Sequence, residues 1–267
     1  MSLPRLFKPF QQVHGASVHG LVSEWFKTQL GEEVLDKEKS LLNQLLPSMF
    51  GYYLVQTGFG APQWLTSSST IHKKVFVSEL PQISEYYHSV CSRLDELALA
   101  TESVDVAILH HSLDFESAPH RALREIARVI IPGGKIVIVG FNPWSIWGFC
   151  QLFMATSARL PWCGNFLSPY RISDWLKLLD FQVEGYESIL HGLPTARPKV
   201  RKLFGWLAYL GQHIWRQKGG VYVMVATKQV STLTPIKPAF QSVRDMVHLP
   251  IGGIAKPSTC KIGSKDS

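Results

Sequence analysis

The stretch from residue 104 to residue 141, VDVAILHHSLDFESAPHRALREIARVIIPGGKIVIVGF, constrains the fold more than any other part of the chain. It opens with an apolar run, Val104 to Leu109, and closes with a second one, Ile136 to Val139, and both have the length of buried strands. Pro119 suits the first turn of a helix between them, and Pro132-Gly133-Gly134 is predicted to end that helix. The apolar stripe of the helix consists of Leu123, Ile126, Ala127 and Ile130. The stretch therefore predicts a right-handed βαβ crossover in a parallel sheet.

Shorter apolar runs elsewhere extend this alternation of strands and helices. Strands are predicted at Tyr52 to Gln56 and Val75 to Val77 before the crossover, and at Phe181 to Tyr186 and Val221 to Ala226 after it. A helix is predicted at Ile172 to Leu179. Together these elements favour an α/β fold in which helices cover both faces of a mostly parallel sheet.

The two ends of the chain differ in character from this α/β part. Residues 21 to 46 have apolar positions at helical spacing on either side of the charged segment GEEVLDKEK, which predicts two helices joined by a polar hinge. Residues 229–267 are rich in Ser, Thr, Pro, Gly and Lys, which predicts a flexible basic tail. We therefore expect a helical cap at residues 1–48, a central domain at residues 49–228 and a tail at residues 229–267.

The net charge of +7 does not point to a nucleic-acid partner. From Lys228 onward the chain has six basic and two acidic residues, so +4 of the +7 lies in its last forty positions. The remaining body carries only +3 and shows no stripe of interleaved basic and aromatic residues. A mildly basic surface of this kind is ordinary for a globular protein.

Cysteine spacing and the N-terminal sequence favour a cytoplasmic protein. MSLPRLFKPFQQVHG lacks the apolar core of a secretory signal. The most apolar stretch, Trp144 to Trp162, is interrupted by polar residues and is too short to span a bilayer. The four cysteines contain no Cys-x-x-Cys pair, so we expect reduced thiols and no metal ion. They are Cys91, Cys150, Cys163 and Cys260.

In an open parallel sheet, ligands bind beyond the carboxyl ends of the strands. After the first predicted strand come Gly58 and Gly60, and glycines there let the backbone approach a ligand closely, although a plain turn would explain them as well. A nicotinamide dinucleotide fingerprint would need a third glycine where the chain has Gln63. No tyrosine has a lysine four places on, so an NAD(P)-dependent oxidoreductase is only a third interpretation.

The crossover segment, SVDVAILHHSLDFESAPHRALREIARVIIPGGKIVIVGFNP, resembles the second half of class I S-adenosylmethionine-dependent methyltransferases of the type 11 group. FGYYLVQTG, SDWLKLLDF and GGVYVMVATK extend the similarity over roughly residues 20 to 228, to a bacterial methyltransferase-like subgroup of uncertain substrate. The resemblance implies a Rossmann-like, doubly wound sheet of seven strands, mostly parallel with the last strand antiparallel. It also implies methyl transfer from S-adenosyl-L-methionine.

The resemblance assigns cofactor contacts residue by residue. Gln56-Thr57-Gly58-Phe59-Gly60 matches the first motif, whose glycines lie against the methionine part of the cofactor. Ser78 or Glu79 stands where an acidic residue receives the ribose hydroxyls, Leu94-Asp95-Glu96-Leu97 matches the segment that lines the adenine, and His110 follows strand four. The first motif normally begins with an acidic residue. The neutral Gln56 therefore keeps open a second interpretation, a non-catalytic member that retains the fold as a binding or interaction module.

Methyl transfer from a sulfonium needs orientation more than a dedicated nucleophile. If the acceptor must lose a proton, His110 or His111 is the best candidate for the base by position and pKa range. One histidine packed in the core and the other capping a loop would explain the pair equally well. Asp114 and Glu116 are interpreted as solvated loop acids or helix N-terminal charges.

The segment NPWSIWGFCQLFMATSARLPW, within residues 142–165, lies where class I enzymes insert substrate-recognition elements. Asn142, Trp144 and Trp147 are predicted to line the substrate pocket, with the segment as a lid over a small or apolar acceptor. The alternatives are that these aromatic residues only pack over the sheet edge, or that they touch a membrane surface peripherally. The sequence does not define the oligomeric state.

Overall fold

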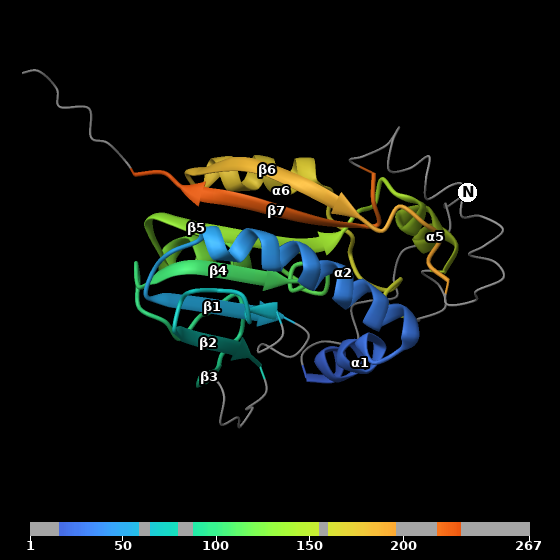
Figure 1. The fold of residues 1–267 in the computed structure, drawn as a ribbon, viewed down its shortest axis with the longest axis horizontal. Coiled ribbons are helices and arrows are strands. Elements are labelled where there is room, and N and C mark those ends of the chain that lie inside the picture. The colour runs from blue at the N-terminus through green and yellow to red at the C-terminus, as the bar shows by residue number, and fades with distance from the viewer. Residues whose placement is uncertain (1–15, 59–64, 80–87, 155–159, 196–217, 231–267) are drawn as a thin grey trace, which may run out of the picture. The chain divides into compact units, whose positions relative to one another are not determined.

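Seven strands form one sheet in the order β3-β2-β1-β4-β5-β7-β6 (Figure 1). The structure is a computed structural model that describes residues 16–58, 65–79, 88–154, 160–195 and 218–230. Neighbouring strands pair in parallel except at β7, which runs antiparallel to both β5 and β6. The strands are β1 Tyr53–Gly58, β2 Lys73–Ser78, β3 His88–Cys91, β4 Val104–His110, β5 Ile130–Phe141, β6 Phe181–Ile189 and β7 Val221–Lys228. The predicted seven-stranded sheet with its last strand antiparallel is confirmed.

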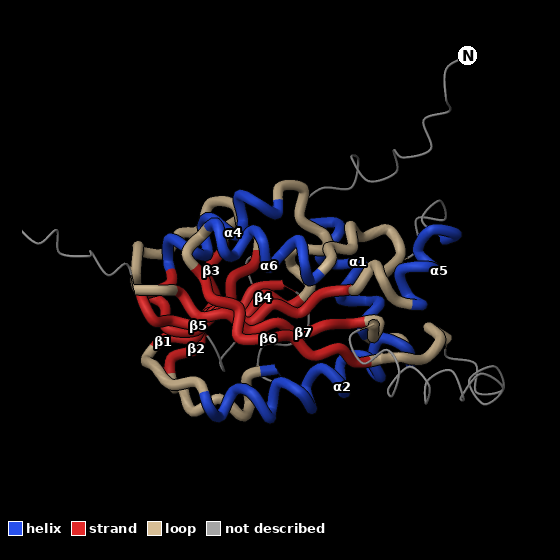
Figure 2. Tube along the Cα trace, turned by 90° about the horizontal axis from the view of Figure 1, so that it is seen from above, coloured by secondary structure: helices blue, strands red, loops and turns tan. Residues whose placement is uncertain are grey.

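Helices cover both faces of the sheet, with α2 on one side and α4 and α6 on the other (Figure 2). Strand side chains alternate between the faces, so each strand contributes to two cores. Leu54, Val106 and Val137 pack in the core under α1 and α2, and Val55, Ala107 and Ile138 pack in the core under α4 and α6. No helix in the described ranges is long and apolar enough to cross a membrane. The helices are α1 Ala16–Phe26, α2 Gln29–Leu45, a 3₁₀ turn η1 Leu46–Ser48, α4 Pro119–Val129, α5 Ile146–Met154 and α6 Pro169–Leu178.

The polar hinge predicted within GEEVLDKEK is wrong, because that whole segment lies inside α2. The chain breaks earlier, at Thr28, whose side-chain oxygen accepts a hydrogen bond from the Gly31 N–H at 3.2 Å and so caps α2. Gly31 then packs against the end of α1, where a Cβ would lie 2.3 Å from the Trp25 carbonyl oxygen. Both helices share one core with the sheet, so the boundary expected at residue 48 does not separate two cores.

The predicted end of the crossover helix is also wrong. α4 ends at Val129, and Pro132-Gly133-Gly134 lies inside β5 rather than at the helix terminus. The β-branched Ile130 already pairs with Val104, and the register then jumps so that Lys135 pairs with Val106. The extra residues bulge out of the ladder, and the positive φ of Gly133, 81°, fits that bulge.

An aspartate near the start of β4 fixes where β1 begins. The Asp105 carboxylate accepts hydrogen bonds from the N–H groups of Tyr52 and Tyr53 at 2.9 and 2.8 Å. These charge-assisted bonds lie at the end of the sheet opposite to the carboxyl ends of β1 and β4. Asp105 therefore has a structural role that sets the register of the two central strands.

At the other end of β1, Gly58 lies against the backbone of β4. A Cβ on Gly58 would lie 1.9 Å from the carbonyl oxygen of His110, and the φ of Gly58 is 106°. Both the contact and the backbone conformation exclude a side chain here. The sequence pattern predicted that the backbone at Gly58 approaches a ligand closely. In the structure, the backbone of Gly58 instead lies close to β4.

We therefore predict that Gly58→Ala destabilises the protein by about 3 kcal/mol or more, from backbone strain plus steric overlap. Urea denaturation of the ligand-free protein measures this change. Gly185→Ala is the matched control, because Gly185 also lies in a strand and a Cβ there would meet nothing within 4 Å. Equal stability of the two variants would contradict this account of β1 and β4.

Candidate functional site

The carboxyl ends of β1, β2, β4 and β5 meet at one edge of the sheet, where α1 and α5 also lie (Figure 1). The structure brings Gln56, Gly58, His110 and Asn142 to this edge. Phe59 and Gly60, which the first motif also includes, lie outside the described residues. The strand ends are tied together by a buried hydrogen bond of 2.7 Å between the hydroxyls of Thr57 and Ser112.

Gln56 is buried, with 1% of its surface exposed, and neither amide atom has a hydrogen-bond partner among the described residues. Alternation along β1 places its side chain on the same face as Leu54, which is the face that α2 covers. A buried amide without partners is costly, and native proteins rarely keep one without reason. The amide offers two donors and an acceptor to a polar ligand at the end of β1.

The carboxylate of Glu38, on α2, bridges the two histidines at the end of β4. One carboxylate oxygen lies 2.8 Å from Nε2 of His110, and the other lies 2.8 Å from Nε2 of His111. All three side chains are fully buried. Their donor atoms all lie within 4.8 Å of one another, which is a grouping that could hold a metal ion.

His111 is held on its other side by Asp114. Its Nδ1 lies 2.9 Å from an oxygen of Asp114, and the same oxygen accepts a hydrogen bond from the Phe141 N–H at 3.0 Å. Asp114 is buried, so its interpretation as a solvated loop acid is wrong. Glu116 does act near the helix terminus, where it accepts hydrogen bonds from the N–H groups of Ser117 and Ala118 just before α4.

Electrostatics of this cluster favour a charged His111. Burial raises the pKa of Glu38, but His111 and His110 outweigh burial and lower it to about 2. Burial lowers the pKa of His111, but the Glu38 carboxylate and the hydrogen bond to Asp114 outweigh burial and raise it to about 9. Burial raises the pKa of Asp114 above its ordinary value, despite the hydrogen bond from His111.

The predicted role of His111 as a base stays a prediction, and its surroundings do not favour it. Both ring nitrogens contact carboxylates, and an imidazolium has no lone pair with which to accept a proton. His111 also has a positive φ of 53°, a backbone conformation that non-glycine residues adopt mainly where the surrounding structure imposes it. His110 shares the Glu38 carboxylate and has no exposed surface.

Glu38 is the residue that sequence reasoning missed. It lies on the same face of α2 as Val34, Leu35, Leu41 and Leu42, all of them buried. A glutamate on the apolar stripe of a helix must find a partner in the core, because an unpaired buried carboxylate is very costly. That pattern was present in the sequence, but the charges around it made the segment resemble a hinge.

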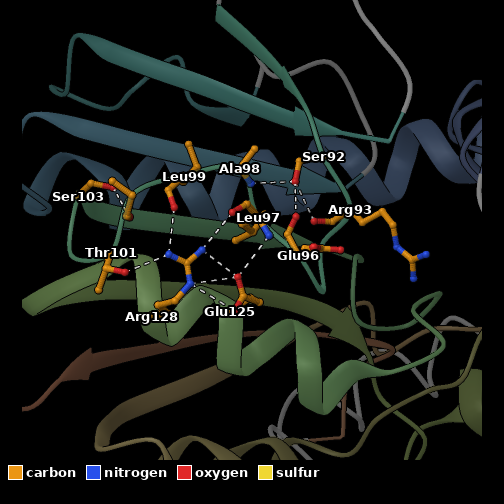
Figure 3. A network of polar contacts seen from close by, with 11 residues as sticks. Ser92, Arg93, Glu96, Leu97, Ala98, Leu99, Thr101, Ser103, Glu125 and Arg128 are labelled. Carbon is orange, nitrogen blue, oxygen red and sulfur yellow. Dashed lines mark hydrogen bonds and ion pairs between the residues drawn. The ribbon is translucent and has the colours of Figure 1, made fainter.

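The segment predicted to line the adenine is fixed to α4 by a network around Arg128 (Figure 3). The Arg128 guanidinium donates hydrogen bonds to the carbonyls of Leu97 and Leu99, each at 3.0 Å, and to the Thr101 hydroxyl at 3.1 Å. It also pairs with Glu125 at 2.9 Å, and Glu125 accepts a hydrogen bond from the Leu97 N–H. The network therefore holds residues 97–101 against the helix.

The other predicted cofactor residues of this region lie around β2 and β3. Leu94 is buried in the core under α4, and Asp95 pairs with the exposed Arg93 at 2.9 Å. Ser78, the last residue of β2, is buried, whereas Glu79 after it is half-buried. Their contacts with a cofactor stay predictions.

The segment predicted as a lid contains α5, and two of its three tryptophans, Trp144 and Trp147, lie in different surroundings. Trp147 is 1% exposed, packs against Phe141 and Trp162, and donates a hydrogen bond from Nε1 to the Gly192 carbonyl at 3.1 Å. Trp144 is 69% exposed. Trp147 therefore belongs to the core in this structure, as the edge-packing alternative stated, and Trp144 is open to a ligand.

Asn142, the third predicted substrate residue, shapes the turn that leads into α5. Its side-chain oxygen accepts a hydrogen bond from the Trp144 N–H at 3.0 Å, and its carbonyl accepts one from the Ser145 hydroxyl at 2.6 Å. Asn142 is buried. Its observed contacts are those of a turn residue, and a contact with substrate stays a prediction.

The sheet order, its antiparallel seventh strand and the polar edge at β1 and β4 define a class I methyltransferase fold. A family model described as a methyltransferase domain matches residues 69–138. Among solved structures, a possible histamine N-methyltransferase from Thermotoga maritima superposes with a TM-score of 0.57. It is 17% identical, and the match covers 78% of this chain and 94% of that chain. The chain thus has the class I methyltransferase fold and contains a segment that matches a methyltransferase domain family.

A bacterial protein shares much of this sequence. The uncharacterized protein YafS of Escherichia coli (strain K12) is 36% identical over 210 residues, which cover 76% of this chain and 80% of YafS. The two proteins are therefore members of one family. The fold also resembles that of the [4+2]-cyclase SpnF, with a TM-score of 0.50 and 19% identity over 73% of this chain and 81% of SpnF.

We predict that the buried cluster makes the stability of the metal-free protein depend on pH. The pKa of His111, about 9, lies above its ordinary value of 6.5. Protonated His111 therefore gives the folded protein its full stabilisation below pH 6.5, and this stabilisation is lost as the pH rises through 9. Each pKa unit is worth about 1.4 kcal/mol, so the loss approaches about 3 kcal/mol. Urea denaturation at pH 7 and pH 10, in the presence of EDTA, measures it.

The variant for comparison is His111→Asn, because asparagine does not titrate and tolerates a positive φ. We expect the wild type to lose more stability between pH 7 and pH 10 than this variant does. His72→Asn, at an exposed histidine, should behave as the wild type. An equal loss in wild type and His111→Asn would contradict the predicted charge on His111.

Proposed function

We propose that this protein transfers a methyl group from S-adenosyl-L-methionine to a small or apolar acceptor. The observation that carries the proposal is the unpartnered amide of Gln56, which lies buried at the end of β1 where methyltransferases of this class begin their first motif. The match of residues 69–138 to a methyltransferase domain supports the same activity. We expect a cytoplasmic protein with a small-molecule acceptor rather than a nucleic acid.

The residues at the sheet edge fit such a cofactor. The Gln56 amide can donate to or accept from its polar groups, and Glu79 and Asp95 remain our candidates for the ribose and adenine contacts. When bound, the cofactor supplies an activated methyl group on a sulfonium, so the protein's task is orientation and exclusion of water. Packing of β1 against β4 at Gly58 keeps this edge fixed.

We assign His110 and His111 a positioning role within this function. Their Nε2 atoms are directed at Glu38, so they hold α2 over the strand ends. Transfer to an acceptor that needs no deprotonation is compatible with this arrangement, because no general base is then required. For the acceptor side we propose the exposed Trp144 with the α5 segment, which favours an apolar or aromatic group.

A second candidate function is a binding or interaction protein that no longer transfers methyl groups. The neutral Gln56 favours it, since the first motif normally begins with an acidic residue. The fold also resembles that of a [4+2]-cyclase, so it is compatible with chemistry other than methyl transfer. A nicotinamide-dependent activity is disfavoured, because the classic dinucleotide-binding sheet lacks the antiparallel strand found here.

Calorimetric titration with S-adenosyl-L-methionine and with S-adenosylhomocysteine tests the proposal. The variant Gln56→Leu tests whether the Gln56 amide contributes to cofactor binding. Leucine removes a buried unpartnered amide, so we expect the ligand-free variant to gain about 1–2 kcal/mol of stability. We also expect it to bind the cofactor about tenfold or more weakly, because the amide is then absent from the site.

Gln44→Leu, at an exposed position on α2, is the control and should leave affinity unchanged. Wild-type protein that shows no heat with either compound would favour the non-catalytic candidate. Wild-type binding with unchanged affinity in Gln56→Leu would mean that the cofactor contacts other residues.

A further inference from the structure

The cluster of Glu38, His110 and His111 has the composition of a metal site. It offers two imidazole nitrogens and both oxygens of one carboxylate, which are ligand types that divalent first-row transition ions such as Zn²⁺ accept. The donors come from elements far apart in sequence, α2 and the end of β4, and all have no exposed surface. The absence of Cys-x-x-Cys pairs does not argue against such a site, because its ligands are histidine and glutamate side chains.

The distances in the cluster suit a shared ion. Zinc bonds to histidine nitrogen and carboxylate oxygen are both about 2.1 Å long. Tetrahedral coordination places such donors about 3.4 Å apart, so each His–Glu38 pair, which is 2.8 Å apart, would open by about 0.6 Å to admit an ion. One ligand atom from each of the three residues lies within 4.8 Å of the other two, which is a grouping that could hold one ion.

Asp114 supplies the outer contact that ligating histidines usually have. It binds Nδ1 of His111 at 2.9 Å and is itself fixed by the Phe141 N–H. A carboxylate on the far nitrogen sets the tautomer and leaves the Nε2 lone pair directed at the ion. In His111 that nitrogen is the one that faces Glu38.

Charge balance gives an independent reason. Glu38 and Asp114 are two buried carboxylates, surrounded by apolar side chains that include Phe26 and Phe141. One divalent ion would compensate the charge of these two carboxylates. The groups that face the cluster from α1 and β5, Phe26 and Phe141, carry no charge that could contribute.

We propose that Glu38, His110 and His111 bind one divalent transition-metal ion of the Zn²⁺ type, which joins α2 to the carboxyl end of β4. All donor side chains are buried, and we assign the ion the structural role of joining these two elements. The ion is incorporated as the protein folds and replaces the protons that the histidines share with Glu38. This inference does not depend on methyl transfer.

Metal content of the untagged full chain tests the proposal. The protein is produced in medium supplemented with Zn²⁺, purified without chelator in metal-free buffer, and measured by inductively coupled plasma mass spectrometry. We expect about one zinc per chain in the wild type. A second preparation from Co²⁺ medium should show visible d–d absorption typical of nitrogen and oxygen ligands. Wild type with no metal above the buffer blank in both preparations would overturn the proposal.

Variants separate this site from adventitious binding. Glu38→Gln should reduce zinc content at least about tenfold, and Asp114→Asn, which keeps the ligands, should weaken retention against a competing chelator about 10–100-fold. If Glu38→Gln does not fold, Asp114→Asn tests the metal site in its place. His72→Ala and Cys91→Ser, at exposed positions, should retain the wild-type content. Full zinc in folded Glu38→Gln, or loss in His72→Ala or Cys91→Ser instead, would contradict the assignment.

Discussion

The rest of the structure depends on one buried carboxylate, that of Glu38. It contacts two adjacent histidines at the end of β4 at once, and so joins α2 to that strand. Removing one partner from a buried charged pair typically costs about 3–5 kcal/mol, because the other charge is then left without compensation. The position of α2 over the strand ends is thus specified by charge as well as by the apolar residues beside it.

The contact of Glu38 with the two histidines is one of several that fix the same edge of the sheet. Gly58 lets β1 lie directly against the His110 carbonyl, and the Thr57 and Ser112 hydroxyls join the same strands. Asp114 extends the cluster to β5 through the Phe141 N–H. A site that works by orienting a reactive cofactor and its acceptor needs such a rigid frame, since small displacements of reacting groups are costly in rate. The amide of Gln56, which has no hydrogen-bond partner among the described residues, lies within that frame and can bond to a polar ligand.

The fold could be predicted from the sequence largely because the crossover around β4, α4 and β5 carries several independent signals. Apolar runs, the helical stripe and Pro119 all agreed, and the family resemblance supplied the seventh antiparallel strand. The helix end was misplaced because Pro132-Gly133-Gly134 is a strong breaker, whereas the pairing of Ile130 with Val104 is a tertiary effect. The short edge strand β3, HSVC, was not predicted, since it has neither length nor a consistently apolar face.

The candidate site could be predicted only in part. Strand ends gave Gln56, Gly58 and His110, because the carboxyl ends of parallel strands necessarily converge. Glu38 was missed because its partners are more than seventy residues away, and Asp114 was misjudged because nothing local shows that a loop acid is buried. Trp147 differs from Trp144 only through the residues packed around it, Phe141 and Trp162, which periodicity does not reveal.

Hydrogen–deuterium exchange with and without S-adenosylhomocysteine tests most directly whether this edge of the sheet is the ligand site. We predict slower exchange, with ligand, in peptides from β1 (Tyr53–Gly58), the end of β4 (Val104–His110) and α2 (Gln29–Leu45), and no change in β6 (Phe181–Ile189). Protection confined to other parts of the chain, with β1 and β4 unchanged at saturating ligand, would contradict the account.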